Sequence, residues 1–138
     1  MKTVKVRKDG HWQHNHCVTK CIYHIVFCPK YRKPVLESKV AKRFKFLVKS
    51  RQEDWNFKII EMEVMPNHVH LLVQCDPEIG INNLVAKIKG FTASQLRKEF
   101  LFLTTRLPCL WTRSRYIASV GSASLETVKK YIEDQKNV

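Results

Sequence analysis

The hydrophobic positions of the chain follow two different periods, and the changes of period divide the chain into strands and helices. Alternating positions rich in β-branched and aromatic residues predict strands over residues 19–28, 57–65, 68–75 and 116–120. Apolar residues at helical spacing predict helices over residues 36–52, 82–100 and 125–136. The predicted order of elements is therefore β-α-β-β-α-β-α.

This order predicts an α+β fold of the ferredoxin-like type. The first six elements match the βαββαβ arrangement, in which two helices cover one face of an antiparallel sheet. The helix over residues 125–136 is an addition, and we expect it to dock on the open face of the sheet. Asn82 and Ser124 are expected to cap the second and third helices. Residues 1–18 are polar and predict an irregular tail before a single domain over residues 19–138.

The charge of the chain points to a polyanionic partner. The 25 Lys and Arg residues outnumber 12 Asp and Glu residues, which gives a formal net charge of +13. Such an excess attracts nucleic acid or anionic membrane surfaces. The sequence contains no apolar run of about 18 residues, so we expect nucleic acid and no membrane. Five cysteines, without an export signal, predict reduced thiols and a cytoplasmic location.

The most informative segment surrounds the turn pair Pro66-Asn67. Side chains alternate along a strand, so His68 and His70 share one face, about 7 Å apart. The opposite face, directed to the core, carries Val69, Leu71 and Val73. If the turn has two residues, Glu63 on the preceding strand lies across from His70. Two imidazoles at this spacing can converge on one metal ion, and the carboxylate of Glu63 could orient a histidine or bind the metal through water.

Tyr131 and Gln135 are four residues apart on the last predicted helix, so they share a helical face that could meet the histidines. Periodicity alone does not distinguish Tyr131 from the other three tyrosines. Two histidines at alternate strand positions also occur by chance in many proteins. A purely structural role for both pairs therefore stays open at this point.

The residues Met65-Pro66-Asn67-His68-Val69-His70, followed downstream by Tyr131-Ile132-Glu133-Asp134-Gln135, resemble the motifs of the HUH single-tyrosine transposases. These enzymes mobilise the smallest prokaryotic insertion sequences. The resemblance extends over about residues 20–136 and includes the segments 23–27, 30–32 and 89–90. Asn67 stands where many members have aspartate.

The resemblance implies a chemistry for these residues. His68, His70 and Gln135 would hold Mg²⁺ or Mn²⁺, which polarises the scissile phosphate. Tyr131 would attack single-stranded DNA and form a 5′-phosphotyrosine link with release of a 3′-OH, and a 3′-OH later reseals the strand. Excision needs two cuts, so the resemblance implies a homodimer, with residues 121–124 as a hinge that lets the catalytic helix dock on either subunit.

The basic residues would then contact DNA, whose ends form hairpins in this family. The candidates for phosphate contacts are Lys30, Arg32, Lys33, Lys87, Lys89, Arg97 and Lys98, with Thr92 and Ser94 between the members on the second helix. A second group of metal-ligand types, His11, His14, His16 and Cys17, lies in the expected tail. We do not expect a structural zinc site there.

Three other functions fit parts of the pattern. A non-catalytic ferredoxin-like protein that binds nucleic acid would form no covalent adduct. A host-tamed relative acting on genomic palindromes would have the same site but different DNA. A metal-dependent phosphodiesterase would keep cleaving DNA after Tyr131→Phe.

Overall fold

The main sheet has four antiparallel strands with interleaved connections. The structure is a computed structural model and describes residues 4–14, 16–120 and 125–135. The strands are β4 (Ile22–Phe27), β5 (Phe57–Met65), β6 (His68–Cys75) and β7 (Tyr116–Ser119), in the order β5-β6-β4-β7. Strand β6 thus separates β4 from β5, and β4 separates β6 from β7. This is the split βαβ arrangement, so the predicted α+β ferredoxin-like fold is confirmed.

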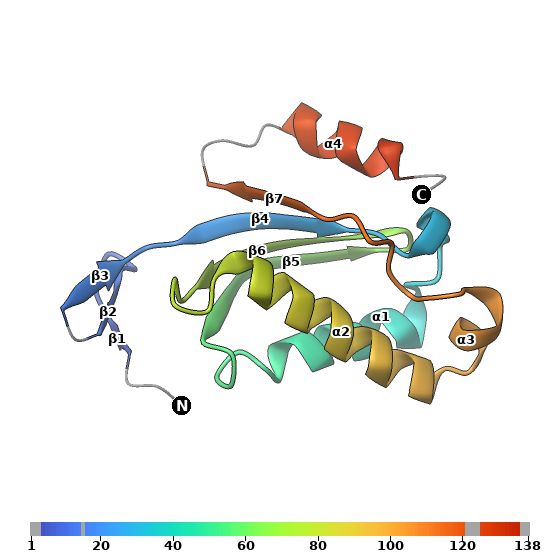
Figure 1. Cartoon of the computed structure of the whole chain (residues 1–138), viewed down its shortest axis with the longest axis horizontal. Helices are drawn as coiled ribbons and strands as arrows, with labels where there is room; N and C mark the ends of the chain where they lie inside the picture. The colour runs from blue at the N-terminus through green and yellow to red at the C-terminus, as the bar shows by residue number, and fades with distance from the viewer. Residues whose placement is uncertain (1–3, 15, 121–124, 136–138) are drawn as a thin grey trace.

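Helices lie on both sides of this sheet. The helices α1 (Ser38–Lys49) and α2 (Ile81–Glu99) cover one face, and α4 (Leu125–Asp134) lies on the opposite side (Figure 1). The predicted position of the last helix over the open face is therefore confirmed. Two short helical elements were not predicted, namely the 3-10 turn η1 (Lys30–Arg32) and the helix α3 (Phe102–Arg106).

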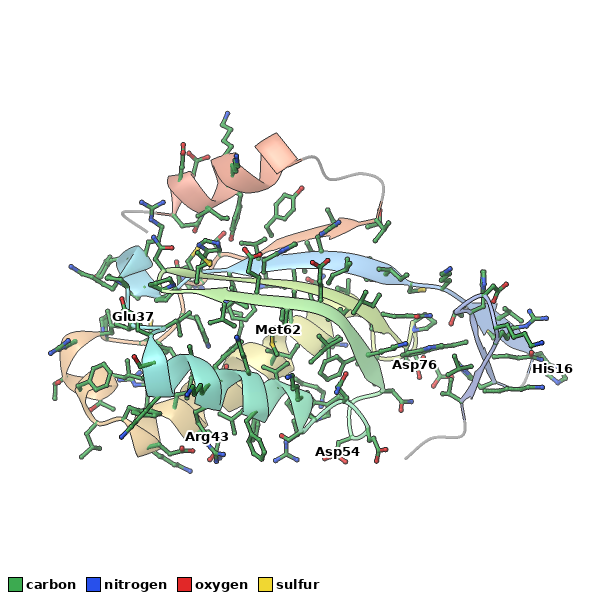
Figure 2. All side chains as sticks on the ribbon, turned by 180° about the vertical axis from the view of Figure 1, so that it is seen from behind. His16, Glu37, Arg43, Asp54, Met62 and Asp76 are labelled. Atoms are coloured by element: carbon green, nitrogen blue, oxygen red, sulfur yellow. The ribbon has the colours of Figure 1, made fainter. Side chains whose placement is uncertain are left out.

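The hydrophobic core fills the space between the sheet and the helices α1 and α2. Its centre is a group of three aromatic rings, in which Trp111 packs edge to face on Phe27 and Phe44 with ring centroids 4.7 and 5.6 Å apart. Phe27 and Phe44 are fully buried. Figure 2 shows Met62 of β5 between the sheet and α1, where it packs against this core. Aromatic burial of this extent is a major contribution to the stability of a small domain.

We expect Phe44→Ala to reduce the free energy of unfolding by about 3–5 kcal/mol, because the change removes a buried ring and leaves a cavity. Phe46→Ala on the same helix is the matched control, since the Phe46 side chain is 59% exposed. Its effect should stay within about 0.5 kcal/mol. Urea unfolding of both variants measures the difference, and equal effects would contradict the described packing.

The N-terminal segment differs from the expected irregular tail. It forms a separate antiparallel sheet of β1 (Lys5–Val6), β2 (Trp12–His14) and β3 (Cys17–Thr19). Trp12 is buried, and the side-chain amide of Gln74 on β6 donates to the carbonyl of Gly10 at 3.0 Å. Two and three-residue strands carry little periodic signal, and they are ordered here by these contacts with the main body.

Other boundaries shift by a few residues. Helix α2 begins directly after Gly80, whose φ of 80° suits a glycine, so Asn82 is inside the helix and not its cap. The expected cap Ser124 and the expected hinge over residues 121–124 lie outside the described residues. All five cysteines are free thiols. In the described ranges, no helix has the length and hydrophobicity needed to cross a membrane.

Candidate active site

The hairpin of β5 and β6 places the two motif histidines on the sheet face opposite the core. Its register pairs Met65 with His68, Val64 with Val69, and Glu63 with His70. The predicted register is therefore confirmed. Val69 is fully buried, whereas His68 and His70 are half-buried. Glu63 is exposed and lies across from His70, on the same face.

The side chain of Asn67 fixes the orientation of His68. The ring nitrogen Nδ1 lies 2.9 Å from the amide oxygen Oδ1 of Asn67. Because that oxygen can only accept, Nδ1 carries the proton and Nε2 is left with a free lone pair. Burial lowers the pKa of His68 below its ordinary value, although the carboxylate of Glu63 opposes this shift. A neutral imidazole with an available lone pair is the form that binds metal ions.

His70 forms a hydrogen bond with a third histidine, His24 of β4. His70 Nε2 lies 3.0 Å from His24 Nδ1, and the two ring planes are 7° apart. The ring centroids are 5.2 Å apart, so the rings meet edge to edge through these nitrogens. Burial and the neighbouring His24 lower the pKa of His70. In this arrangement, Nδ1 of His70 is the nitrogen that remains free.

Sequence reasoning missed the role of His24 in this site. His24 is opposite Leu72 in the register, which places it on the face of His68 and His70. The sequence does contain a signal for this position, which is the alternation along β4. Ile25, the next residue, is fully buried in the core, so the side chain of His24 must point to the other face of the sheet. A polar residue in the other phase of a buried strand indicates a side chain on the second face.

Helix α4 carries Tyr131, and Gln135 directly follows its last residue, Asp134. Tyr131 is half-buried and Gln135 is buried, whereas the charged side of the helix is exposed at Lys129, Lys130, Glu133 and Asp134. The burial of both side chains agrees with the predicted common face. Arg32 of η1 holds the C-terminal part of this helix, since its Nη1 donates to the carbonyl of Ile132 at 3.4 Å.

The hydroxyl of Tyr131 lies against the segment that leads into β7. Tyr131 Oη is 2.7 Å from Ser114 Oγ, and the Tyr131 ring lies 5.3 Å from the ring of Tyr116. Burial raises the pKa of Tyr131, and the hydrogen bond with Ser114 opposes that increase. Ser114 was not among the residues expected from the sequence.

Gln135 carries an unusual buried oxygen. The residue is 6% exposed, and its Oε1 has no hydrogen-bond partner within the part of the chain that the structure describes. A buried polar atom without a partner destabilises a fold by about 1–3 kcal/mol. A divalent cation would supply the missing partner, because such ions bind carbonyl oxygens.

These side chains fit the metal that the sequence implies. Among the described residues, no three or more His, Cys, Asp and Glu side chains are grouped as metal ligands. A metal between His68 and His70 therefore needs a ligand of another type, and the amide oxygen of Gln135 is of that type. The resulting donors are two imidazoles and one carbonyl oxygen.

Three of the basic candidates for phosphate contacts have protein partners. Lys89 Nζ donates to the carbonyls of Thr112, Arg113 and Ser114 at 2.7, 3.5 and 3.2 Å. Arg97 donates to the carbonyls of Pro108 and Leu107, and Arg32 to that of Ile132. The expected surface position of Thr92 is wrong, because Thr92 is fully buried and accepts a hydrogen bond from the indole of Trp111.

The other four candidates lie nearer to solvent, and Lys98 is one of the exposed residues. Lys33 and Lys87 are exposed and Lys30 is half-buried. Lys30 lies over the ring of Tyr31 and Lys87 over the ring of Trp55, with ammonium-to-centroid distances of 5.2 and 5.7 Å. Their contact with DNA stays a prediction.

The internal position of Lys89 predicts a pH dependence of stability. Burial lowers the pKa of Lys89 to about 8. The unfolded chain therefore binds more protons between pH 8 and about 10.4, the ordinary lysine pKa. The wild-type free energy of unfolding should then rise, relative to Lys89→Met, as pH increases through this window. Urea unfolding from pH 7 to 10 measures the difference, with Lys87→Met as control; a constant difference would contradict the prediction.

The comparisons with known proteins agree on one family. The sequence profile of the family described as Transposase IS200 like matches residues 17–135. The ISDra2 transposase TnpA of Deinococcus radiodurans is 35% identical over 115 residues, which are 82% of each chain. The transposase for insertion sequence element IS200 of Salmonella typhimurium is 28% identical over 122 residues, 87% of this chain and 80% of the relative.

Solved structures show the same relationship. A transposase crystal structure from Deinococcus radiodurans superposes with a TM-score of 0.83 at 28% identity and covers 91% of this chain and 98% of its own. The structure of a REP-associated tyrosine transposase bound to a REP hairpin has a TM-score of 0.56 at 12% identity, covering 88% of this chain and 68% of that one, and shows a shared fold. Because the family profile spans most of the sequence, and the motif histidines and Tyr131 fall within it, the chain belongs to the IS200-like transposase family.

Proposed function

We propose that this transposase cuts and rejoins single-stranded DNA at insertion-sequence ends through a 5′-phosphotyrosine intermediate, with Tyr131 as nucleophile. The observation that carries the proposal is the buried Oε1 of Gln135, which has no hydrogen-bond partner among the residues that the structure describes. Gln135 directly follows helix α4, four residues after Tyr131, and the helix lies over the sheet face of His68 and His70. A hydroxyl nucleophile and a set of metal ligands are thereby directed to the same side of the sheet.

We propose Mg²⁺ or Mn²⁺ as the ion of this site, held by His68, His70 and Gln135. When bound, the ion supplies Lewis-acid polarisation of the scissile phosphate. The chain itself supplies the orientation of the ligands. Asn67 holds His68 with Nε2 free, and His24 holds the ring of His70 through its Nε2. Hydrogen-bond partners of this kind hold metal-ligating side chains in a fixed orientation.

The proposed reaction conserves the phosphodiester. The Oη of Tyr131 forms a bond to phosphorus, the bond from phosphorus to the 3′ oxygen breaks, and the leaving oxygen becomes a 3′-OH. The phenol loses its proton in the same process. Since the new link is again a phosphodiester, a 3′-OH can attack it and restore a DNA strand with Tyr131 free. Hydrolysis by water would lose this ability.

We further propose that the DNA carries hairpin ends and that two subunits act together. The net charge of +13 favours a polyanion, and the distant relative in the solved complex is bound to a hairpin. The sequence of the last helix contains one tyrosine. Excision requires two cuts, so two chains supply the two nucleophiles in a homodimer.

A covalent-adduct experiment tests the proposed function. The protein is mixed with labelled single-stranded DNA from the ends of its own locus in the presence of Mn²⁺ or Mg²⁺, and the products are separated on a denaturing gel. We expect a protein–DNA band that needs the metal, and peptide mapping should place the nucleotide on Tyr131. Cleavage without this band would indicate a hydrolytic phosphodiesterase. Binding without cleavage or adduct, on any locus end or genomic palindrome, would indicate a non-catalytic protein.

A further inference from the structure

The side chain of Ser114 is in contact with the atom that would attack DNA. Ser114 Oγ lies 2.7 Å from Tyr131 Oη, in a half-buried position two residues before β7. The ring of Tyr116, two residues further, packs against the ring of Tyr131. The nucleophilic hydroxyl is thus held by the segment of residues 112–116 and not only by its own helix.

This segment is anchored to the main body of the fold. Lys89 of α2 binds three of its consecutive carbonyls, with the shortest contact of 2.7 Å to Thr112. The backbone amide of Thr112 donates to the carbonyl of Cys28 at 3.0 Å, and Arg115 donates to the side chain of Asn82 on α2 at 3.2 Å. The position of Ser114 is therefore set by α2 and by the residue after β4, independently of α4.

The chemistry of the attack gives Ser114 a role. The phenol of Tyr131 must lose its proton to solvent as the bond to phosphorus forms, so negative charge develops on Oη. Burial of Tyr131 disfavours that charge and raises its pKa, while the hydrogen bond with Ser114 and, to a smaller extent, the positive charge of Arg115 oppose the effect of burial. A serine hydroxyl can rotate to donate to an oxygen that becomes charged, and hydrogen bonds to charged atoms are stronger than those between neutral groups.

We propose that Ser114 is a catalytic residue of DNA cleavage, whose hydroxyl donates a hydrogen bond to Tyr131 Oη during attack, and that Lys89 is the positioning residue that holds Ser114 in place. The inference rests on the proposed function of Tyr131. In this inference Lys89 acts through contacts within the protein, whereas the sequence pattern had predicted that it contacts a DNA phosphate.

The test uses four variants of the full chain. Ser114→Ala removes the donor, Ser114→Thr keeps it, and Ser114→Cys replaces it with a weaker one. Ser50→Ala is the matched control, because Ser50 bonds to the carbonyl of Leu47 at the end of α1, a helix on the other side of the sheet. The first measurement is the initial rate of adduct formation on saturating DNA from pH 6 to 9.5. The second is the ionisation of ring-labelled Tyr131 in the DNA-free protein, followed by NMR.

We expect Ser114→Ala to form adduct at least about tenfold more slowly, with the rise of its pH–rate profile moved to higher pH. Ser114→Thr should have the adduct rate and the pH–rate profile of the wild type, and both should be intermediate in Ser114→Cys. The Tyr131 pKa should rise in Ser114→Ala and not in Ser50→Ala. An unchanged rate, profile and Tyr131 pKa in Ser114→Ala would overturn the inference.

Lys89→Met separates positioning from DNA binding. We expect slower adduct formation with an unchanged Kd for DNA and an unchanged salt dependence of that Kd, because Lys89 acts through Ser114. Weaker DNA binding with an unchanged rate on saturating DNA would overturn the role given to Lys89. If the wild type forms no adduct at all, the proposed function fails, whereas the NMR titration still reports whether Ser114 controls Tyr131.

Discussion

Tyr131→Phe is expected to reduce covalent adduct formation by more than about a thousandfold, since removal of a nucleophilic side chain costs at least that much in enzymes with covalent intermediates. The change keeps the ring that packs against Tyr116 and removes the atom that bonds to Ser114. The free energy of unfolding should fall by only about 1 kcal/mol. DNA affinity should stay within a factor of two or three of the wild type.

The measurement is the adduct band on a denaturing gel, with a DNA-binding assay beside it. Tyr23→Phe is the matched control, because Tyr23 of β4 is also half-buried and also has a pKa raised by burial. It should keep full adduct formation. Cleavage that persists in Tyr131→Phe would mean that water or another side chain attacks the phosphate, and the tyrosine mechanism would be wrong.

Gln135→Leu is expected to change stability and metal binding in opposite directions. The leucine side chain removes an oxygen that is buried without a partner among the described residues, so the metal-free protein should gain about 1 kcal/mol in free energy of unfolding. The same change removes a ligand of the proposed ion. We expect the affinity for Mn²⁺ to fall by at least about tenfold, the size of effect seen even for residues that only support a metal ligand.

Gln74→Leu provides the contrast for this experiment. Gln74 is also a buried glutamine, but its amide donates to the carbonyl of Gly10 at 3.0 Å. Its replacement should therefore destabilise the fold and leave Mn²⁺ affinity unchanged. Isothermal titration with Mn²⁺ and urea unfolding of the metal-free variants measure both quantities. If Gln135→Leu were less stable than the wild type with unchanged Mn²⁺ affinity, Gln135 would be a structural residue and not a ligand.

The hairpin that carries the histidines could be predicted in detail from the sequence. Strands β5 and β6 have the predicted bounds, and Glu63 lies across from His70 as the two-residue turn requires. These features depend on alternation over eight or nine residues and on a local turn, both of which are visible in the sequence. The common face of Tyr131 and Gln135 was predictable for the same reason, since helical spacing fixes it.

The contacts between distant segments could not be predicted in this way. His24 and His70 are 46 positions apart, and Lys89 reaches carbonyls more than 20 positions away. A lysine on a helix that also carries Lys87 and Arg97 has the same sequence pattern whether it points to solvent or to a loop. Its burial depends on how the segment after α3 returns across α2. The small N-terminal sheet that contains Trp12 also depends on contacts with a distant segment, such as the hydrogen bond from Gln74 to Gly10.

The alternation along β6 constrains the evolution of this hairpin. Because buried valine and leucine alternate with the histidines, one strand contributes to the core on one face and carries the proposed metal ligands on the other. Substitutions on the two faces can therefore accumulate independently. The Pro66–Asn67 turn sets the register of the two strands, and a register shift of one residue would exchange the faces and place His68 and His70 in the core. In related mobile elements, the length of this turn should vary less than the identity of its residues.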